Sequence, residues 1–343
     1  MPATIRDVAK LAGVSEATVS RALRDLRHVA PDTAEAVRIA ADRLGFVPSR
    51  NAAALATGRP RAVAVVTPGL GPWFYSSVLE GADAALKRAG WATSLVNLGE
   101  PDGSRRRLTA VELGTGQASA YLVIGFGLDA AEQQVLREVR APLVSVGGRF
   151  PGVRGIGIPE SDATRLVVEH LLALGHRRIA HIGADLGPGI NESVVGGRRA
   201  AWAATLADAG ITAEPDWFAS GGLRLDDSRT AAEHLLVRAD RPTAIFAATD
   251  ESALGVLLAA QRLGLRVPDD LSVAGLDDHP YAAAHGLTTV RQLPAEQGGR
   301  AAALLLADLG VRRGAVSTAP APIELVVRSS TAPPPARVSA AGS

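Results

Sequence analysis

The residues whose functional groups are best suited to recognition lie near the N-terminus, on one predicted helix from Ser15 to about Leu23. At 3.6 residues per turn, one side of this helix gathers a carboxylate, a methyl group, a hydroxyl group and two guanidinium groups. They belong to Glu16, Ala17, Ser20, Arg21 and Arg24. In the major groove of DNA these groups match cytosine N4, the thymine methyl group, phosphate oxygens and the guanine edge. The face therefore predicts base reading, and the competing interpretation is the solvated side of a surface helical hairpin.

The elements that position this face form a helix-turn-helix. Thr4 caps a first helix, with Asp7 as the second half of a capping box. Gly13 ends that helix in a left-handed conformation, and Ser15 caps the second one. The apolar side of the first helix comes from three residues, Val8, Leu11 and Ala12. A third helix from Pro31 to Leu44 gives both a surface to bury against, so residues 1–46 are predicted to form an all-α head.

Residues 47–60 are alanine-rich and bracketed by prolines, and their middle is only about two helical turns long. Isolated helices of this length are marginal in water, so one interpretation is a plain linker. The alternative is a hinge that becomes helical when a second copy and a DNA groove pack against it. In that case Leu55 is an apolar wedge between base steps.

Composition and charge separate the head from the rest of the 343-residue chain. The chain is 47% hydrophobic and 21% charged, which is typical of a globular protein of about two or three domains. Residues 1–61 hold ten Lys and Arg against six Asp and Glu, a net charge of +4, which leaves −3 for the remainder. A basic head on a slightly acidic body is the footprint of a nucleic-acid module attached to another domain.

The same composition excludes several classes of protein. There is no cysteine, so disulfides and thiolate metal sites are excluded. The N-terminus does not resemble a signal peptide, and the chain contains no apolar run of about 18 residues that could cross a membrane. These features predict a cytoplasmic protein without a membrane partner.

From residue 62 onward, short β-branched runs alternate with helical stretches, as in parallel sheets with crossover helices. Strands are predicted near residues 62–66, 92–98, 120–124, 143–146, 155–158, 179–182, 244–247, 272–275, 287–290 and 323–327. Helices are predicted near residues 76–89, 102–112, 130–139, 162–174, 192–209, 228–239, 252–263 and 294–309. Residues 61–330 are therefore predicted to form an α/β core of two Rossmann-like subdomains, and residues 331–343 a disordered tail.

Six ordered motifs carry a resemblance over nearly the whole chain. They are IRDVAKLAGVSEATVSRAL at 5–23, RLGFVPSRNAAALATG at 43–58, HLLALGHRRIAHIG at 170–183, ATDESALG at 248–255, VPDDLSVAGLDD at 267–278 and LTTVRQ at 287–292. With these motifs the chain resembles the lactose/galactose repressor (LacI/GalR) family of bacterial transcription regulators. The resemblance implies a helix-turn-helix head and a core like a periplasmic sugar-binding protein, with a ligand between two subdomains. It also implies a homodimer or tetramer on double-stranded operator DNA.

The resemblance further implies how the subdomains share the chain. The first subdomain takes residues 61–160 and 293–320, and the second takes 161–292 and 321–330. The chain would cross between them near Glu160, Leu293 and Pro320.

The family pattern also assigns functional residues. Base contacts fall on Glu16, Ala17 and Arg21, and Leu55 takes the minor-groove position. The full set expected at DNA is Thr4, Ser15, Glu16, Ala17, Thr18, Ser20, Arg21, Arg24, His28, Thr33, Asn51 and Leu55. The set expected at the effector is Trp73, Phe74, Arg198, Thr249, Asp250, Asp277 and Gln292. A cleft arginine with carboxylates and an aromatic ring suits the hydroxyl groups and the apolar face of a sugar.

Three departures bear on the ligand: Pro159, Thr249 and Leu276 stand where the family often has Asp, Asn and an aromatic residue. They favour an atypical sugar or a nucleoside.

Other functions are weighed against this hypothesis. An enzyme is the competing class, yet the chain has no phosphate-binding GxxxxGK[ST] loop, no GxSxG elbow and no GxGxxG. A sugar-binding protein without DNA activity would not need the head. His170, His176 and His181 lack the i, i+4 spacing of a zinc helix, so no metal, cofactor or catalytic residue is predicted. The prediction is a ligand-responsive regulator, a repressor rather than an activator.

Overall fold

The computed structural model describes residues 3–23, 29–46, 60–100, 104–113, 118–125, 128–185 and 194–335. The chain divides into two compact units, a head of residues 1–61 and a core of residues 62–343. Apart from Pro60, the predicted hinge at 47–60 lies outside the described residues, as do Arg24 and His28.

The head is built from α1 (Ile5–Ala12), α2 (Glu16–Ala22) and α3 (Pro31–Leu44). The predicted capping box is present, since Asp7 N donates to Thr4 Oγ1 and Thr4 N donates to Asp7 Oδ2. Gly13 ends α1 with a φ of 68°, and Ser15 caps α2 by accepting from Thr18 N at 3.1 Å. The helix-turn-helix is therefore confirmed.

One residue from each helix of the head is fully buried: Val8, Val19 and Val37. The prediction that Leu11 belongs to the buried side of α1 is wrong, because its side chain is 48% exposed and Ala9 packs inward in its place.

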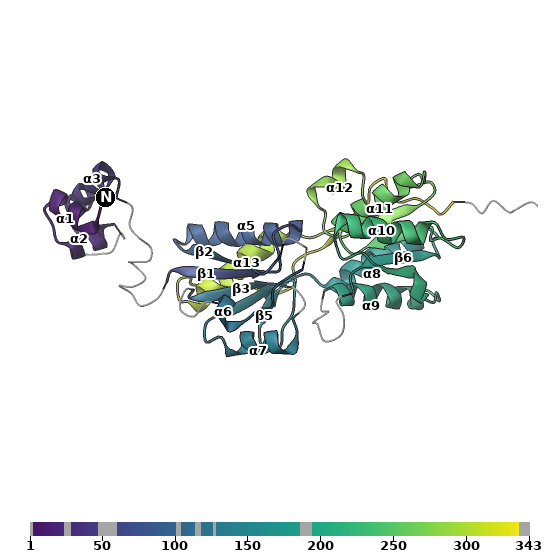
Figure 1. Ribbon diagram of the computed structural model, residues 1–343, viewed down its shortest axis with the longest axis horizontal. Coiled ribbons are helices and arrows are strands. Elements are labelled where there is room, and N and C mark those ends of the chain that lie inside the picture. Colours follow the sequence, from purple (N-terminus) through teal and green to yellow (C-terminus); the bar gives the residue numbers. More distant parts are fainter. Residues whose placement is uncertain are drawn as a thin grey trace, which may run out of the picture. The chain divides into compact units, whose positions relative to one another are not determined.

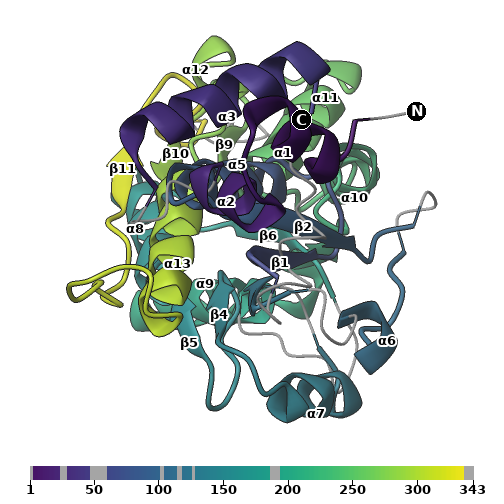
Figure 2. The ribbon, with the colours of Figure 1, turned by 90° about the vertical axis from the view of Figure 1, so that its left-hand side faces the viewer.

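The first half of the core is a parallel sheet with the strand order β2-β1-β3-β4-β5. Its strands are β1 (Ala62–Thr67), β2 (Ala92–Asn97), β3 (Ala120–Ile124), β4 (Leu143–Val146) and β5 (Arg154–Ile156). One face packs on α5 (Trp73–Arg88) and α13 (Pro294–Asp308), while the other packs on α7 (Ala130–Glu138). Figure 1 shows α5 and α7 on opposite sides of this sheet, and Figure 2 shows α13 beside β4 and β5.

The second half of the core repeats this arrangement with the order β7-β6-β8-β9. Its strands are β6 (Ile179–Gly183), β7 (Phe218–Ser220), β8 (Ala244–Ala247) and β9 (Ser272–Ala274). On one face lie α8 (Glu160–Ala173) and α9 (Val195–Asp208), and on the other lie α10 (Leu225–Leu236) and α11 (Asp250–Arg262). An antiparallel pair, β10 (Thr289–Arg291) and β11 (Glu324–Val326), continues the sheet through a bridge between Asp277 and Arg291.

The chain passes between the two halves at three places: between β5 and α8, between β10 and α13, and between α13 and β11. At the third crossing Ala321 N donates to Gly157 O at 2.7 Å, so this crossing runs beside the first. Residues 294–308 thus complete the core of the first half although they follow the second half in sequence. These crossings coincide with those expected near Glu160, Leu293 and Pro320.

Two expectations about the core differ from the structure. In the helix predicted at 102–112, the described part is helical only in α6 (Ala110–Leu113). Arg105, Arg106 and Arg107 instead reach separate carboxylates, and the Arg105 guanidinium contacts Glu132 on α7 at 2.5 and 2.8 Å. Consecutive side chains that each need a different partner favour an extended segment.

The tail is predicted to begin at residue 331, but the fold continues through Ala332. The carbonyl oxygen of Ala332 lies 2.8 Å from His176 Nε2, and the Ala332 N–H donates to Ser272 Oγ at 3.0 Å. Residues 336–343 lie outside the described part of the chain.

Candidate functional site

The first candidate site is the outer face of α2. Glu16, Ala17 and Arg21 are exposed, Ser20 is half-buried, and Val19 and Ala22 face the head's core, as the helical spacing predicts. The Arg6 guanidinium of α1 donates to Glu16 Oε1 at 3.1 Å, and Arg21 Nε donates to Ala17 O at 3.2 Å. In the described residues this face therefore presents charged groups held by short local contacts.

The remaining residues predicted to contact DNA lie near the starts of helices or outside the described residues. Ser15 and Thr18 lie in the first turn of α2 with their hydroxyl oxygens 2.9 Å apart, where helix N–H groups can bind a phosphate. Thr4 is occupied in its capping box, and Thr33 lies half-buried in the first turn of α3. The roles expected for Arg24, His28, Asn51 and Leu55 fall outside the described residues and stay predictions.

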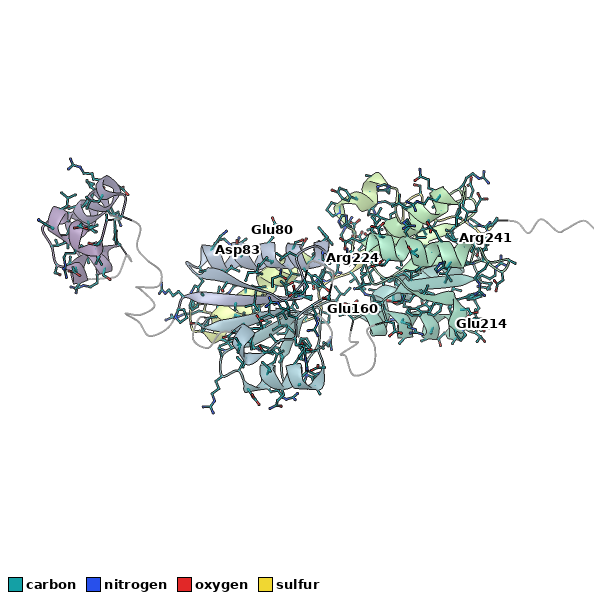
Figure 3. All side chains as sticks on the ribbon, viewed as in Figure 1. Glu80, Asp83, Glu160, Glu214, Arg224 and Arg241 are labelled. Atoms are coloured by element: carbon teal, nitrogen blue, oxygen red, sulfur yellow. The ribbon has the colours of Figure 1, made fainter. Side chains whose placement is uncertain are left out.

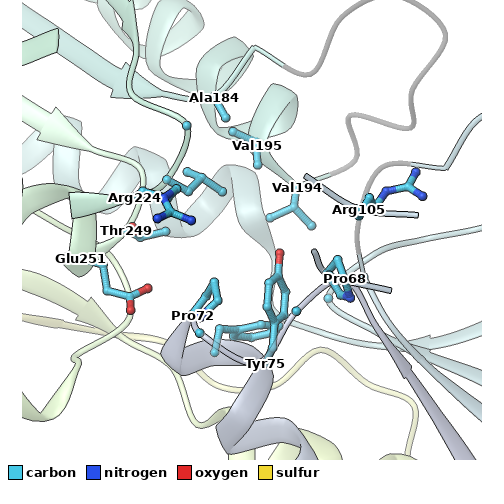
Figure 4. A pocket seen from close by; sticks show the side chains of 18 of the residues that line it. Pro68, Pro72, Tyr75, Arg105, Ala184, Val194, Val195, Arg224, Thr249 and Glu251 are labelled. Carbon is cyan, nitrogen blue, oxygen red and sulfur yellow. The ribbon is translucent and has the colours of Figure 1, made fainter. Parts of the chain in front are cut away.

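The second candidate site is a cavity of about 790 Å³ in the core. It lies where the strands of both sheets end at their carboxyl edges, which is the usual ligand position in open α/β sheets. The first half contributes residues 68–72 after β1 and the start of α5, and the second half contributes the start of α9 and the loops after β8 and β9. Figure 4 shows Tyr75 and Thr249 facing this space from opposite halves.

Arg198 anchors the cavity on the side of the second half. Its side chain is only 5% exposed, Nε donates to Glu160 Oε2 at 2.7 Å, and Nη1 donates to Ala248 O. Glu160 stands where the chain crosses into the second half, and Figure 3 places it at the junction of the two halves. The guanidinium is thus fixed toward the cavity by a buried ion pair at the first crossing.

A chain of hydrogen bonds runs from the cavity into the first half. Asp277 Oδ1 accepts from Gln292 Nε2 at 2.6 Å, and Gln292 Oε1 accepts from Gln297 Nε2 of α13 at 2.9 Å. Burial raises the pKa of Asp277 well above its ordinary value, against the opposing effect of the Arg198 charge. Asp277 also adopts a φ of 140°, a strained conformation that persists only where its surroundings hold it.

Five of the predicted effector residues line the cavity: Phe74, Arg198, Thr249, Asp277 and Gln292. The other two, Asp250 and Trp73, are not among the described residues that form the wall of the cavity. Asp250 is fully buried behind it, where its carboxylate accepts from His279 N at 2.7 Å and Thr289 Oγ1 at 2.6 Å. Burial raises the pKa of Asp250 to about 7. Asp250 therefore organises the loop after β9 and lies outside the described lining, so its role at the effector stays a prediction.

Trp73 is the other predicted effector residue that lies outside the described lining. Its ring packs edge-on against the His279 ring, with the centroids 5.2 Å apart, and it is absent from the described lining. The neighbouring Tyr75 takes its place, and burial raises the pKa of its phenol to about 12, so the hydroxyl stays protonated.

Sequence reasoning missed several lining residues: Asn97, Glu100, Glu160, Asp185, Arg224 and Glu251, together with Tyr75. Most of them follow the carboxyl end of a strand or begin the next helix. Ligands of open α/β sheets bind beyond the carboxyl ends of the strands, and this rule applied to the predicted strands would have found these residues. Residue types alone did not indicate them.

The histidines serve the fold. The His176 ring nitrogens lie 2.9 Å from Thr243 Oγ1 and 3.0 Å from Ser272 Oγ, and His181 stacks on Phe246 with centroids 4.8 Å apart. Within the described ranges, no group of three or more His, Asp and Glu side chains is placed to hold a metal ion. The described helices also include none that is long and apolar enough to cross a bilayer.

Comparison with known families matches both parts of the chain. Residues 4–49 match the family described as bacterial regulatory proteins, lacI family. Residues 168–331 match the periplasmic binding protein-like domain.

Individual proteins give the same result over the whole length. The HTH-type transcriptional repressor PurR of Pectobacterium carotovorum subsp. carotovorum is 30% identical over 321 residues, which cover 89% of this chain and 90% of the relative. The structure of the lac repressor dimer bound to operator and the anti-inducer ONPF superimposes with a TM-score of 0.80 at 27% identity, covering 97% and 100% of the two chains. The complex of the transcriptional regulator CelR with cellobiose gives a TM-score of 0.68 at 29% identity, covering 96% and 99%.

Proposed function

This chain belongs to the lacI family of bacterial regulatory proteins, which makes it a DNA-binding transcriptional regulator, and we propose that it is a homodimeric repressor controlled by a sugar. In this proposal two heads place the outer faces of α2 in successive major grooves of a palindromic operator. The sugar binds between the two halves of the core and changes how they are arranged, which alters the affinity for DNA.

The observation that carries the sugar assignment is the composition of the cavity wall. Arg198, Asp277 and Gln292 offer hydrogen-bond donors and acceptors to the cavity from the second half and from the segment that leads back to the first half. The Phe74 ring and the Tyr75 phenol line the cavity from the first half. Converging polar groups opposite an aromatic surface suit a ring with hydroxyl groups on its rim and an apolar face. A sugar also binds the CelR relative, whose complex contains cellobiose.

A second candidate effector is a nucleoside. The two aromatic rings that line the cavity, Phe74 and Tyr75, lie with their centroids 5.9 Å apart and offer a surface on which a base could stack. The departures at Pro159, Thr249 and Leu276 from the usual family residues favour either this alternative or an atypical sugar.

A thermal-shift screen of the full chain with sugars and nucleosides tests the effector assignment. A ligand at 100 times its dissociation constant stabilises the folded state by about 2.7 kcal/mol. We expect a monosaccharide or disaccharide to raise the melting temperature of the wild-type chain and to leave Arg198→Ala unchanged. A shift with nucleosides alone would select the second candidate, and an equal shift in both chains would remove the cavity from the proposal.

Selection on randomised duplexes, followed by titration at several salt concentrations, tests the DNA part. Contacts from two heads to phosphates release counterions, so the logarithm of the affinity should fall steeply with the logarithm of the salt concentration. We expect a palindromic consensus bound by two chains. Binding by a strict monomer, or a slope near zero, contradicts the proposal.

A further inference from the structure

Glu251 lines the cavity but has no part in the function proposed above. It lies in the first turn of α11, in the second half of the core. Its Oε1 accepts a hydrogen bond from Trp73 N at 3.3 Å, and Trp73 is the first residue of α5 in the first half. In Figure 4 the Glu251 carboxylate points into the space that the two halves enclose. This contact therefore joins the two halves directly across the cavity.

The end of α5 that receives this carboxylate has no side-chain cap from the described residues of the first half. The 16-residue helix starts after Pro72, which supplies no side-chain cap, and its first turn contains no acidic residue. The first N–H groups of a helix need acceptors, and the positive end of its dipole favours a negative charge. Glu251 supplies both from the opposite half.

The contact is reinforced by a second one beside it. The Trp73 ring packs against His279, which follows β9 in the second half. Since Trp73 provides both the donated N–H and the ring, a rotation that opened the cavity would break the two contacts together.

The charges around the cavity are unevenly matched. Of the described lining residues, Arg105, Arg198 and Arg224 each have a carboxylate neighbour, with shortest distances of 2.5, 2.7 and 3.7 Å to Glu132, Glu160 and Asp227. The carboxyl groups of Glu251 and Asp277 instead accept hydrogen bonds from uncharged donors, Trp73 N and Gln292 Nε2. Among the described lining residues, five carboxyl groups therefore accompany three guanidiniums. The Arg105 and Arg198 guanidiniums are in close contact with acids of the protein, whereas Arg224 is exposed and only near Asp227.

An anionic ligand would be costly in such a site. A phosphate group carries up to about two negative charges at pH 7. Beside the half-buried Glu251 and the buried Asp277 it would lose water and meet repulsion from any ionised carboxyl group, while the Arg105 and Arg198 guanidiniums are already paired with acids of the protein. A hydroxyl or ammonium group would instead donate to the oxygens that are present.

We propose that Glu251 is the specificity-determining residue of this cleft: it bridges the two halves through Trp73 N and selects effectors that carry hydrogen-bond donors and no negative charge. The inference rests on the proposed function, since it takes the cavity to be the effector site. Glu251 is a positioning residue for closure, and the ligand class is uncharged or cationic, which excludes phosphorylated sugars and nucleotides.

The bridge is tested on the full chain without ligand. The sequence has no cysteine, so Glu80→Cys and Glu214→Cys place spin labels at exposed positions of the first and second halves, which Figure 3 labels. In Glu251→Ala we expect the label-to-label distances to lengthen and broaden. In Glu251→Gln the amide oxygen still accepts from Trp73 N, so the distribution should stay close to that of the wild type.

Glu100→Ala is the matched control. Glu100 lines the same cavity, but its carboxylate pairs with Arg106 in its own half at 2.8 Å, so its removal should leave the distances unchanged. Unchanged distances in Glu251→Ala, or equal changes in Glu100→Ala, would overturn the bridge.

Charge selection is tested by calorimetry with two matched pairs, D-glucose with D-glucose 6-phosphate and adenosine with adenosine monophosphate. We expect the neutral member of a pair to bind the wild type at least tenfold more tightly, and the ratio to fall toward one in Glu251→Gln, which keeps the bridge and loses the charge. Tighter binding of a phosphorylated member to the wild type, or a ratio that Glu251→Gln leaves unchanged, would overturn the selection. If no member binds, the sugar and nucleoside assignments fail together with the selection, while the label distances still decide the bridge.

Discussion

The outer face of α2 and the core cavity differ in how the chain assembles them. Glu16, Ala17 and Arg21 come from six consecutive positions on one helix, so the helical period alone places them side by side. Tyr75, Arg198 and Asp277 are each separated by dozens of residues and meet because two sheets end at the same place. A surface made by one helix can be predicted from its sequence pattern, whereas a cavity made by many strand ends requires the topology.

The two regions also differ in the cost of changing them. The charged groups on α2 are exposed and keep their contact with water, so removing one alters recognition more than stability. In the cavity, Arg198 and Asp277 are buried, and each depends on the other polar groups around it. Substitutions there affect binding and folding together. The predictions below test this contrast.

The largest effect is expected for Arg198→Ala. The change removes a cavity donor and leaves the largely buried Glu160 without its cation, which costs about 3–5 kcal/mol when one partner of a buried pair is lost. We expect effector binding to be abolished and the melting temperature of the core to fall. Tryptophan fluorescence follows this transition selectively, since all four tryptophans lie beyond residue 61.

Arg199→Ala is the matched control for that variant. Arg199 is the next residue of α9, but its guanidinium lies over the Phe218 ring at 3.7 Å and it is exposed. Near-normal effector binding is expected. If both variants lose the effector equally, the cavity is not the binding site.

A smaller effect is expected for Arg21→Ala on α2. Loss of one bidentate base contact costs about 1–3 kcal/mol of discrimination, so operator affinity should fall and the preference at particular base pairs should relax. The fluorescence-detected melting of the core should not change. Arg38→Ala on α3 provides the comparison, and an identical base preference in wild type and Arg21→Ala would show that the reading face lies elsewhere.

The pH dependence of stability should reveal Asp250, which is buried behind the cavity wall. Its pKa is raised to about 7, compared with about 3.9 for an unfolded chain, so the folded state binds the extra proton between these values. The contribution of the Asp250 carboxyl group to the free energy of unfolding is fully present below about pH 4 and is lost as the pH rises through about 7. The melting temperature of the wild type relative to Asp250→Asn should therefore decline by a few °C across this window.

Asp270 provides a control of opposite sign. Its hydrogen bonds with Arg266 lower the pKa of its carboxyl to about 2, so its contribution is present above about pH 4 and is lost on acidification toward pH 2. If Asp250→Asn shows the same pH profile as the wild type, Asp250 is not titrating in the folded core.

The smallest effect is expected for Thr4→Ala in the head. The variant removes the capping box of α1, which should destabilise that helix by about 1 kcal/mol. Faster amide exchange in residues 5–12 of the full chain measures this loss, and Thr33→Ala should leave exchange there unchanged. A change confined to the core would contradict the role of Thr4 in capping α1 of the head.

Much of the fold follows from the sequence for physical reasons. Buried runs such as residues 120–124 and 143–146 are mostly apolar and include several β-branched residues, and their predicted bounds match β3 and β4. The edge strand β7 was missed because it is only three residues long and partly exposed, so it has no apolar run. The helix expected at 102–112 failed because Arg105 pairs with Glu132, a partner 27 residues away that local propensity does not register.

The candidate site shows the same limit. Motif matching named Arg198, Asp277 and Gln292, which line the cavity. It also named Asp250 and Trp73, which turn toward the loop after β9 instead. Adjacent residues such as Thr249, Asp250 and Glu251 differ in role because they point in different directions at a helix start. The position of such a residue in the sequence predicts which loop it belongs to, but it does not predict the direction in which its side chain points.

The return of the chain to the first half has a consequence for synthesis on the ribosome. Ala301, Leu304 and Leu305 of α13 are buried against β1, β3 and β4, yet they follow the whole segment from α8 to β10 in sequence. Although domains generally fold in the order of their synthesis, the first half cannot complete its core until about residue 308 has emerged. The nascent chain therefore exposes an apolar sheet face through most of its elongation, and chains released early should be prone to aggregation.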